Sequence, residues 1–391
     1  MKAALLAPIL LFSLLLLSSC FSSKPTIKIG LNVEATGEVP AVGKSTINAA
    51  KLFVYQINSS GGIDLRGEKI PLELVIGDNE SKPEEAVAVA RRLIAQDKVI
   101  AMIGPNVSSC SIPASEIAES SGCLMISPWS TNPHTTRSSH DSEDSFKKNV
   151  FRSCFTEIQE APILAHFALQ ELHAHRAAIL YDMSSESPSS AAHQFEESFR
   201  KLGGTLVAAE TYTTGDRDFS TQLTKIKSVH PDLLFIPAYY NDVPLIAQQA
   251  RRLGISAQFL GYNSWSTPEI IQLDVEHCLE NACFSNHFSP TSSLPAAKKF
   301  VTLYEKTYDQ PPDDIAALTY DAMLLLSEAI VRAGSSNRLS VREAMSRIEN
   351  FSGVTGDFYY CQGSHDPLKS LVIFTIKDGS FVPRIMMKPH W

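Results

Sequence analysis

Apolar residues recur along this chain at two alternating spacings, one typical of strands and the other typical of helices. Residues 27–31 carry apolar side chains at every second position, whereas residues 45–58 carry them at helical spacing. The pair Gly61-Gly62 ends this helix. The order then repeats, with strands expected at residues 72–76, 101–103 and 124–126 and helices at residues 83–96 and 111–120.

A second series of the same kind follows the polar stretch at residues 132–148. We expect strands at residues 177–181, 205–212, 233–237 and 259–261, and helices at residues 161–172, 190–202, 220–228 and 242–253. Strands that alternate with helices predict a parallel sheet covered by helices on both faces. The sequence therefore predicts an α/β protein with two similar βα lobes in tandem.

The end of the chain has a mixed pattern. Helices are expected at residues 297–308, 313–333 and 341–348, and strands at residues 358–360 and 371–376 before the turn Lys377-Asp378-Gly379. This order suggests that the chain returns to the first lobe and finishes on the second.

The first twenty residues have the pattern of an export signal. Met1 and Lys2 precede an apolar run at residues 3–17, which is shorter than the roughly 20 apolar residues that a membrane-spanning helix needs. Ser18, Ser19 and Cys20 follow, and Leu17-Ser18-Ser19-Cys20 resembles a bacterial lipobox. We expect residues 1–19 to be removed and Cys20 to be lipidated, which anchors an exported protein to a membrane. The alternative is an ordinary cleavage site beside a chance cysteine.

Charge and cysteine spacing exclude several classes of partner. The formal charge is −8 and no dense run of Lys and Arg occurs, so we expect no nucleic-acid partner. The cysteines form no Cys-x-x-Cys and no Cys/His spacing suited to zinc, so we expect no metal and no cofactor. Cys278 and Cys283 are near enough in sequence to form a disulfide in an oxidising compartment, or they pack as free thiols.

One segment is similar to a phosphate-binding loop without matching it. Residues 37–45 run from Gly37 to Gly43-Lys44-Ser45, but five residues separate the glycines where a P-loop has four, and Pro40 lacks an N–H for the phosphate. The sequence also lacks His-Glu-x-x-His and Gly-x-Ser-x-Gly. We therefore expect no nucleotide site and no enzymatic activity.

Several segments together resemble the type I periplasmic binding proteins, specifically the branched-chain amino-acid binding components of ABC importers. The likeness covers nearly the whole chain after residue 20. It is carried by Ile63-Asp64-Leu65-Arg66-Gly67, Ile103-Gly104-Pro105, Ile126-Ser127-Pro128-Trp129-Ser130-Thr131-Asn132-Pro133, Phe151-Arg152, Asp218-Phe219-Ser220, Pro237-Ala238-Tyr239-Tyr240-Asn241-Asp242 and Gly353-Val354-Thr355-Gly356.

This resemblance implies two Rossmann-like lobes joined by three hinge crossovers, which close over a ligand. We expect residues 1–19 as the signal peptide, residues 24–154 with 287–354 as the N-terminal lobe, and residues 155–286 with 355–391 as the C-terminal lobe. In such folds the ligand lies at the carboxyl ends of the strands.

On the first lobe, Ser108 and Ser109 follow a strand and begin a helix, where hydroxyls and backbone N–H groups can hold a carboxylate. An ordinary helix cap would also place serines there. By resemblance, Trp129, Ser130 and Thr131 line the same side, although Trp129 could instead belong to the core.

On the second lobe, Tyr239 follows a buried strand and can close on the ligand. Asn263 stands where relatives commonly have an acid that pairs with the ligand ammonium. Either another acid takes over, with Glu186 as the nearest candidate, or the ligand is an amide or carboxylic acid without a free ammonium. The sequence favours a ligand without a free ammonium.

We expect the protein to capture a small polar solute, an amino acid or a relative, in the periplasm or at the cell surface. Its expected partners are this solute, the permease subunits of an ABC transporter, and the membrane through the lipid. The rival hypotheses are a ligand-sensing module for a receptor and an exported hydrolase on the same scaffold.

Overall fold

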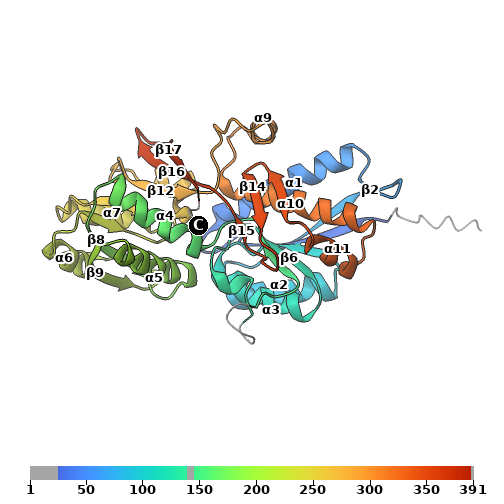
Figure 1. Ribbon diagram of the computed structural model, residues 1–391, viewed down its shortest axis with the longest axis horizontal. Helices are drawn as coiled ribbons and strands as arrows, with labels where there is room; N and C mark the ends of the chain where they lie inside the picture. Colours follow the sequence, from blue (N-terminus) through green and yellow to red (C-terminus); the bar gives the residue numbers. More distant parts are fainter. Residues whose placement is uncertain (1–24, 139–144, 389–391) are drawn as a thin grey trace, which may run out of the picture.

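The computed structural model describes residues 25–138 and 145–388. The predictions that concern residues 1–24, including the signal peptide and Cys20, lie outside the described residues. In the described part, the chain forms two α/β bodies side by side along the long axis of the molecule (Figure 1).

The first body is built on a five-stranded sheet with the order β4-β1-β5-β6-β7, in which all pairs are parallel. Its strands are β1 (Ile27–Val33), β4 (Leu72–Asp78), β5 (Ala101–Ile103), β6 (Leu124–Ser127) and β7 (Val150–Arg152). Alternate residues of β5 face opposite layers. Ala101 and Ile103 pack with one group of helices, whereas Met102 packs with the other.

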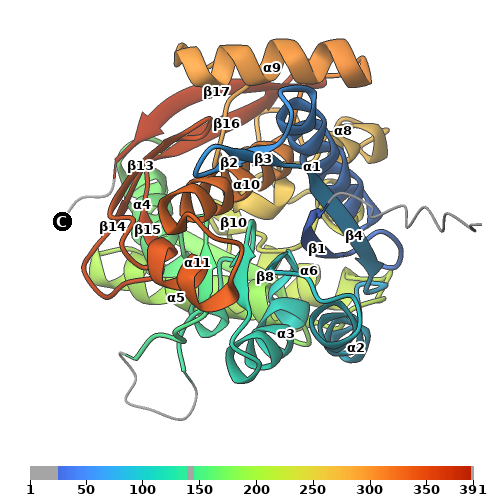
Figure 2. The ribbon, with the colours of Figure 1, turned by 90° about the vertical axis from the view of Figure 1, so that its right-hand side faces the viewer.

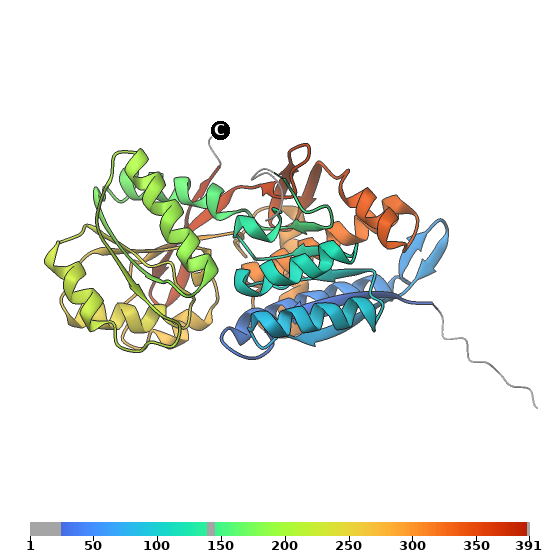
Figure 3. The same ribbon diagram turned by 90° about the horizontal axis from the view of Figure 1, so that it is seen from below.

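Helices cover both faces of this sheet. One layer contains α1 (Pro40–Ser59), α10 (Asp314–Ala333) and α11 (Arg338–Met345), and the other contains α2 (Pro83–Ala95) and α3 (Ser108–Ser120). Helices from both ends of the sequence therefore share one layer. Figure 3 shows the two bodies from below, with blue and cyan segments in one and green and yellow segments in the other.

The second body has a seven-stranded sheet with the order β17-β16-β12-β11-β10-β8-β9. The pairs from β9 to β12 are parallel and the pairs from β12 to β17 are antiparallel. Its strands are β8 (Arg176–Asp182), β9 (Thr205–Tyr212), β10 (Leu233–Phe235), β11 (Gln258–Gly261), β12 (Cys283–Asn286), β16 (Leu371–Lys377) and β17 (Ser380–Met387).

The second sheet is covered in the same manner as the first. Leu233 and Phe235 of β10 face α4 (Glu157–Gln170) and α5 (Glu186–Lys201), whereas Leu234 faces the opposite layer. That layer contains α6 (Ser220–Ser228), α7 (Val243–Arg252) and α8 (Glu269–Leu273). The α/β architecture of two Rossmann-like bodies predicted from the alternating pattern is confirmed.

Short elements complete the described part. A hairpin joins β2 (Ile63–Leu65) to β3 (Glu68–Ile70), and single 3-10 turns span Pro133–Thr135 and Asn263–Trp265. Helix α9 (Pro295–Tyr308) lies on the outside of the molecule (Figure 2) and packs Phe300 and Tyr304 against Leu52 of α1.

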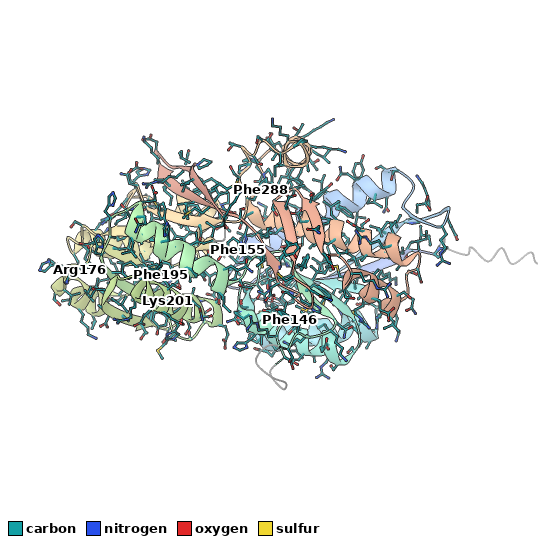
Figure 4. The ribbon with its side chains drawn as sticks, in the orientation of Figure 1. Phe146, Phe155, Arg176, Phe195, Lys201 and Phe288 are labelled. Atoms are coloured by element: carbon teal, nitrogen blue, oxygen red, sulfur yellow. The ribbon has the colours of Figure 1, made fainter. Side chains whose placement is uncertain are left out.

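The chain passes between the two sheets three times, after β7, after β12 and after β15 (Pro367–Leu368). Phe155 of the first passage and Phe288 of the second both lie in the middle of the molecule (Figure 4). The ring of Phe155 stacks on His287, with centroids 3.7 Å apart. Aromatic packing therefore joins two of the passages directly.

The third passage between the sheets begins later in the chain than the predicted domain boundary. The sequence placed the return to the second lobe after residue 354, but β13 (Asn350–Gly353) and β14 (Gly356–Tyr360) form a hairpin, and β14 also pairs with β15. Phe358 and Tyr360 belong to the core of the first body. Hairpin pairing and this burial keep the chain on the first body through β15.

The helix predicted at residues 45–58 begins earlier, at Pro40. Proline suits the first turn of a helix because its missing N–H has no partner there in any case. Gly43, Lys44 and Ser45 therefore lie inside α1 rather than in a loop, so the segment similar to a P-loop offers no phosphate cradle.

No helix in the described ranges is both long enough and apolar enough to cross a membrane. The described cysteines, including Cys278 and Cys283, are free.

Gly261, the last residue of β11, leads to a prediction about stability. A Cβ atom on Gly261 would lie 2.2 Å from the ring of Trp265, which is fully buried and donates to the Ile236 carbonyl at 3.0 Å. Gly261→Ala should therefore lower the free energy of unfolding by about 1–3 kcal/mol, measured by urea denaturation. The cost should shrink when the same change is made in a Trp265→Leu background. An equal cost in both backgrounds would mean that contact with Trp265 is not the reason why residue 261 must be glycine.

Candidate functional site

A small cavity lies where the carboxyl ends of the strands of the two sheets face each other. The first body contributes the residues after β5 and β6, and the second contributes those after β8, β10 and β11. Its lining consists of Asn106, Val107, Ser108, Trp129, Thr131, Ser187, Tyr239, Tyr262, Asn263 and Ser264, five from each body.

Ser108 contributes a hydroxyl and a helix N-terminus. It is the first residue of α3, where backbone N–H groups have no partner within the helix and favour an anion. Its Oγ lies 2.9 Å from Ser130 Oγ, which in turn lies 2.6 Å from Thr135 Oγ1. This chain of hydroxyls holds Ser108 in place at one end of the cavity.

Glu34, after β1, fixes the loop that carries Ser108. Its buried carboxylate accepts hydrogen bonds from the Asn106 backbone N–H at 3.0 Å, the Asn106 amide at 2.8 Å and the Val107 N–H at 3.2 Å. Burial raises the pKa of Glu34, and these hydrogen bonds oppose the shift. Glu34 therefore orients the N-terminus of α3 without reaching the cavity.

Arg152, at the end of β7, fixes the loop that carries Trp129 and Thr131. Its guanidinium donates to the carbonyls of Ser130 and Asn132, at 2.5 and 2.8 Å, and its Nε lies 2.6 Å from a carboxylate oxygen of Asp366. The guanidinium is fully buried. A buried Arg with these partners makes the loop rigid, because breaking one contact leaves a desolvated charge.

On the second body, two loops are tied to each other. Ser264 donates to the Ala238 carbonyl at 2.7 Å, so the turn after β11 is held beside the segment that carries Tyr239. The rings of Tyr239 and Trp129 then meet across the two bodies, with centroids 6.3 Å apart. Trp129 also donates its Nε1 hydrogen to Asp314 at 3.2 Å.

Glu157, the first residue of α4, connects the two sides of the cavity. Its Oε1 accepts hydrogen bonds from Thr131 Oγ1 of the first body at 3.0 Å and Ser187 Oγ of the second at 2.8 Å. Its carboxyl group is buried, and the Ser190 hydroxyl also interacts with it. Burial raises the pKa of Glu157 to about 7, against the effect of the hydroxyls.

Glu160 lies one turn further along α4. Its Oε1 accepts from the backbone N–H of Asn263 at 3.0 Å and from the hydroxyl of Ser285. Burial raises its pKa to about 8. Glu157, Glu160 and Tyr262 lie together beside the cavity.

The surroundings of the cavity are acidic. Burial, followed by repulsion from Asp313, raises the pKa of Asp314 to about 7. Burial, and to a smaller extent the charges of Asp242 and Asp182, raises the pKa of Glu38 to about 7. None of the ten lining residues is Lys, Arg or His.

Five residues predicted from the sequence line the cavity together: Ser108, Trp129, Thr131, Tyr239 and Asn263. Ser130 is buried behind them, with its hydroxyl on Ser108.

Two predicted residues are placed elsewhere. Ser109 is half-buried and is not part of the lining, because the helical rotation of α3 turns it away from Ser108. Glu186 is exposed at the start of α5, whereas the next residue, Ser187, faces the cavity. The assignment of Glu186 to the cavity was therefore wrong by one helical position.

Sequence reasoning missed Glu34, Glu157, Ser187 and Tyr262. Glu157 gave a local signal, since it follows the Phe151-Arg152 motif at the first turn of a helix. Its importance depends on hydroxyls 26 and 30 residues away, which no local pattern connects to it. Within the described residues, no group of three or more His, Cys, Asp or Glu side chains is arranged to hold a metal ion.

Comparison with known proteins gives consistent matches. The family model described as periplasmic binding protein matches residues 26–380. The Leu/Ile/Val-binding protein BraC3 of Rhizobium johnstonii is 30% identical over 310 residues, which cover 79% of this chain and 80% of that protein.

Two solved structures are similar in fold and sequence. The leucine-binding protein LivK of Thermotoga maritima has a TM-score of 0.85 and 32% identity, covering 93% of this chain and 99% of that one. The branched-chain amino-acid transporter substrate-binding protein LivJ of Streptococcus pneumoniae, in complex with isoleucine, has a TM-score of 0.85 and 31% identity, covering 93% and 100%.

The buried acids predict a pH-dependent stability. A carboxyl whose pKa is raised on folding stabilises the protein below its unfolded pKa, and this stabilisation is lost as the pH rises through the folded pKa. For Glu160 this window runs from the ordinary value of 4.5 to about 8. Glu160→Gln should therefore improve stability at pH 8 relative to pH 5 by at least about 1.4 kcal/mol, the equivalent of one pKa unit.

The measurement is urea denaturation of both proteins at the two pH values. The change in the free energy of unfolding between the two pH values is compared for the variant and the unmodified protein. This comparison separates Glu160 from other buried groups such as His287, whose lowered pKa acts in the opposite direction. Glu171→Gln, at the exposed end of the same helix, is the matched control. If the free energy of unfolding changes equally with pH in Glu160→Gln and Glu171→Gln, Glu160 is not protonated on folding.

Proposed function

The chain belongs to the periplasmic binding protein family, and from this premise we propose that it captures a small amino acid outside the cytoplasm and delivers it to an ABC permease. The family recognised from the sequence motifs is confirmed by the family model and by the relatives. We further propose that the protein performs no chemistry on the solute and that Cys20 carries its membrane anchor.

The observation that carries this proposal is the shared lining of one polar cavity. Five lining residues come from each body, and the bodies are joined by three separate passages of the chain. A ligand in such a position contacts both bodies at once and favours their closed arrangement, as expected for a hinged binding protein. A ligand bound to one body alone would not provide that coupling.

The polarity of the cavity supports a small zwitterionic solute. The start of α3, with Ser108, suits a carboxylate, and the acids around α4 suit a cationic group. The relative LivJ was solved with isoleucine, a molecule of this class.

The direct test is native mass spectrometry of the purified protein, followed by calorimetry with a panel of free amino acids. The proposal expects one small molecule per chain and binding of at least one amino acid. Complete lack of binding across the panel, with no co-purified solute, would contradict amino-acid capture. Release of a chemically altered product would contradict the absence of catalysis.

Thr131→Ala should weaken binding of the solute by about ten- to a hundredfold, because it removes a hydrogen-bonding hydroxyl that faces a charged ligand. Calorimetry gives the dissociation constants. Thr302→Ala, on the exposed side of α9, is the matched control and should leave the affinity unchanged. Unchanged binding in Thr131→Ala, Ser108→Ala and Tyr239→Ala alike would mean that the solute binds elsewhere.

Cys20→Ser should release the protein from membranes, since a small-residue pair precedes Cys20 directly after the apolar run. The test is expression in a bacterial host with a radiolabelled fatty acid, followed by membrane fractionation. Retained label and unchanged membrane partition in the variant would disprove the anchor. Cys361→Ser, which changes an exposed cysteine, is the control.

A further inference from the structure

We infer that the contact between residues 38–42 of the first body and residues 240–243 of the second, which we call the lip, makes closure of the two bodies depend on pH. Tyr240 of the second body caps α1 of the first and favours closure, whereas ionised Glu38 repels acids of the second body and opposes it. Neither side chain lines the cavity, so both act on closure rather than on the solute itself. The effect on solute affinity rests on the proposed function, but the lip does not.

Tyr240 provides the cap that α1 lacks within its own body. The N-cap residue, Val39, makes no side-chain hydrogen bond, and Pro40 at the first helical position has no N–H. The backbone N–H of Ala41 is therefore the first donor of α1 without a partner in the helix. The hydroxyl of Tyr240, a residue that is only 5% exposed, accepts a hydrogen bond from the backbone of Ala41. This contact joins the two bodies and is lost when they separate.

Apolar packing adds to this cap. Val39 and Val42, which are 1% and 0% exposed, belong to the same buried apolar cluster as Tyr240 and Val243. Separation of the bodies returns part of this apolar surface to water, which is unfavourable. The lip therefore favours the closed arrangement even without a solute.

Glu38, directly before Val39, brings an acid to the same contact. The residue is half-buried. Burial raises its pKa to about 7, and the charges of Asp242 and Asp182 contribute to this shift to a smaller extent. Both of these acids belong to the second body, since Asp182 ends β8 and Asp242 precedes α7. Ionised Glu38 therefore repels the second body when the lip is closed.

The two acids of the second body are held in place. Asp182 accepts hydrogen bonds from the backbone N–H and the hydroxyl of Ser184, at 2.8 and 2.6 Å, and Asp242 accepts one from the Tyr212 hydroxyl at 3.2 Å. Rotation of either acid away from the lip would break these bonds. Arg217 lies 4.0 Å from Asp242, but its side chain is 68% exposed, so water screens this pair.

The other titratable groups that act with Glu38 are Tyr239, Tyr240 and, on α3, Cys110. Burial raises the pKa of each of them, so all three stay neutral between pH 6 and pH 8. Burial also raises the pKa of Asp242, an effect in the same direction as that on Glu38. Glu38 therefore supplies the change of charge at the lip near neutral pH.

Closing the lip takes up a proton. When the bodies separate, water surrounds Glu38 and its pKa returns towards the ordinary 4.5. Because the pKa is higher in the closed arrangement, Glu38 favours closure fully below pH 4.5, and this contribution is lost as the pH rises through about 7. Between pH 6 and pH 8 the loss corresponds to about a tenfold shift towards the open arrangement. Solute affinity should fall with it, because the solute contacts both bodies.

Small-angle X-ray scattering of the solute-free protein tests the lip without any ligand. The radius of gyration should increase between pH 6 and pH 8, and it should increase less in Glu38→Gln, which cannot ionise. Glu38→Lys, whose charge attracts Asp182 and Asp242, should be more compact than the unmodified protein at pH 8. Glu85→Gln changes an exposed acid of α2 and is the matched control. Equal radii in Glu38→Gln, Glu38→Lys and the control at both pH values would overturn the inference.

Calorimetry with L-leucine and L-isoleucine tests the consequence for the solute. The dissociation constant should rise about tenfold more between pH 6 and pH 8 in the unmodified protein than in Glu38→Gln. An equal rise in both proteins would overturn the inference. If neither amino acid binds at either pH, the result counts against the proposed function, while the scattering experiment still decides whether the lip acts as inferred.

Tyr240→Phe keeps the ring in the apolar cluster and removes only the hydroxyl that caps α1. Loss of a helix cap should weaken amino-acid binding about two- to thirtyfold and increase the radius of gyration at pH 6. Tyr359→Phe, which changes an exposed tyrosine, is the matched control and should behave as the unmodified protein. Equal radii in Tyr240→Phe and this control would contradict the capping role and with it the inference.

Discussion

The burial of Glu157 at the junction of the two bodies is the constraint on which the cavity depends. Ser187 contacts its carboxylate from within the second body, whereas Thr131 reaches it from the first, so the Thr131 contact exists only when the bodies are together. Burial makes an ionised acid costly, and the hydroxyls of Ser190, Ser187 and Thr131 offset part of that cost. The same carboxyl group therefore links the position of the bodies to the state of a proton.

The passages between the bodies form a second polar network that supports this junction. Arg152 holds the loop behind the cavity and pairs with Asp366 near the third passage. Lys369 donates to the carbonyl of Ser153 in the first passage, and Asp321 accepts hydrogen bonds from the backbone of Val354 and Thr355. Each buried charge thus has partners on segments far apart in sequence. Such contacts make the arrangement of the passages specific, because a shift would leave a desolvated charge without its partner.

Much of the site could be predicted because the chain order of an α/β fold fixes where its loops meet. Ser108, Thr131 and Tyr239 each follow a buried strand, and the carboxyl ends of parallel strands lie on one edge of a sheet. Glu186 shows the limit of that reasoning. The loop was identified correctly, but one residue of helical rotation decides whether a side chain faces the cavity or the solvent, and it is Ser187 that faces inward.

The sequence by itself determined the alternation of strands and helices, the two bodies, the family and five residues of the cavity, because these depend on local periodicity and short motifs. The tertiary structure alone decided the contacts of Glu157, the supporting position of Glu34 and the retention of β14 and β15 on the first body. These features depend on contacts between residues distant in the chain and on desolvation. Burial is a property of the packed molecule, and no spacing along a sequence specifies which acid will lose its water.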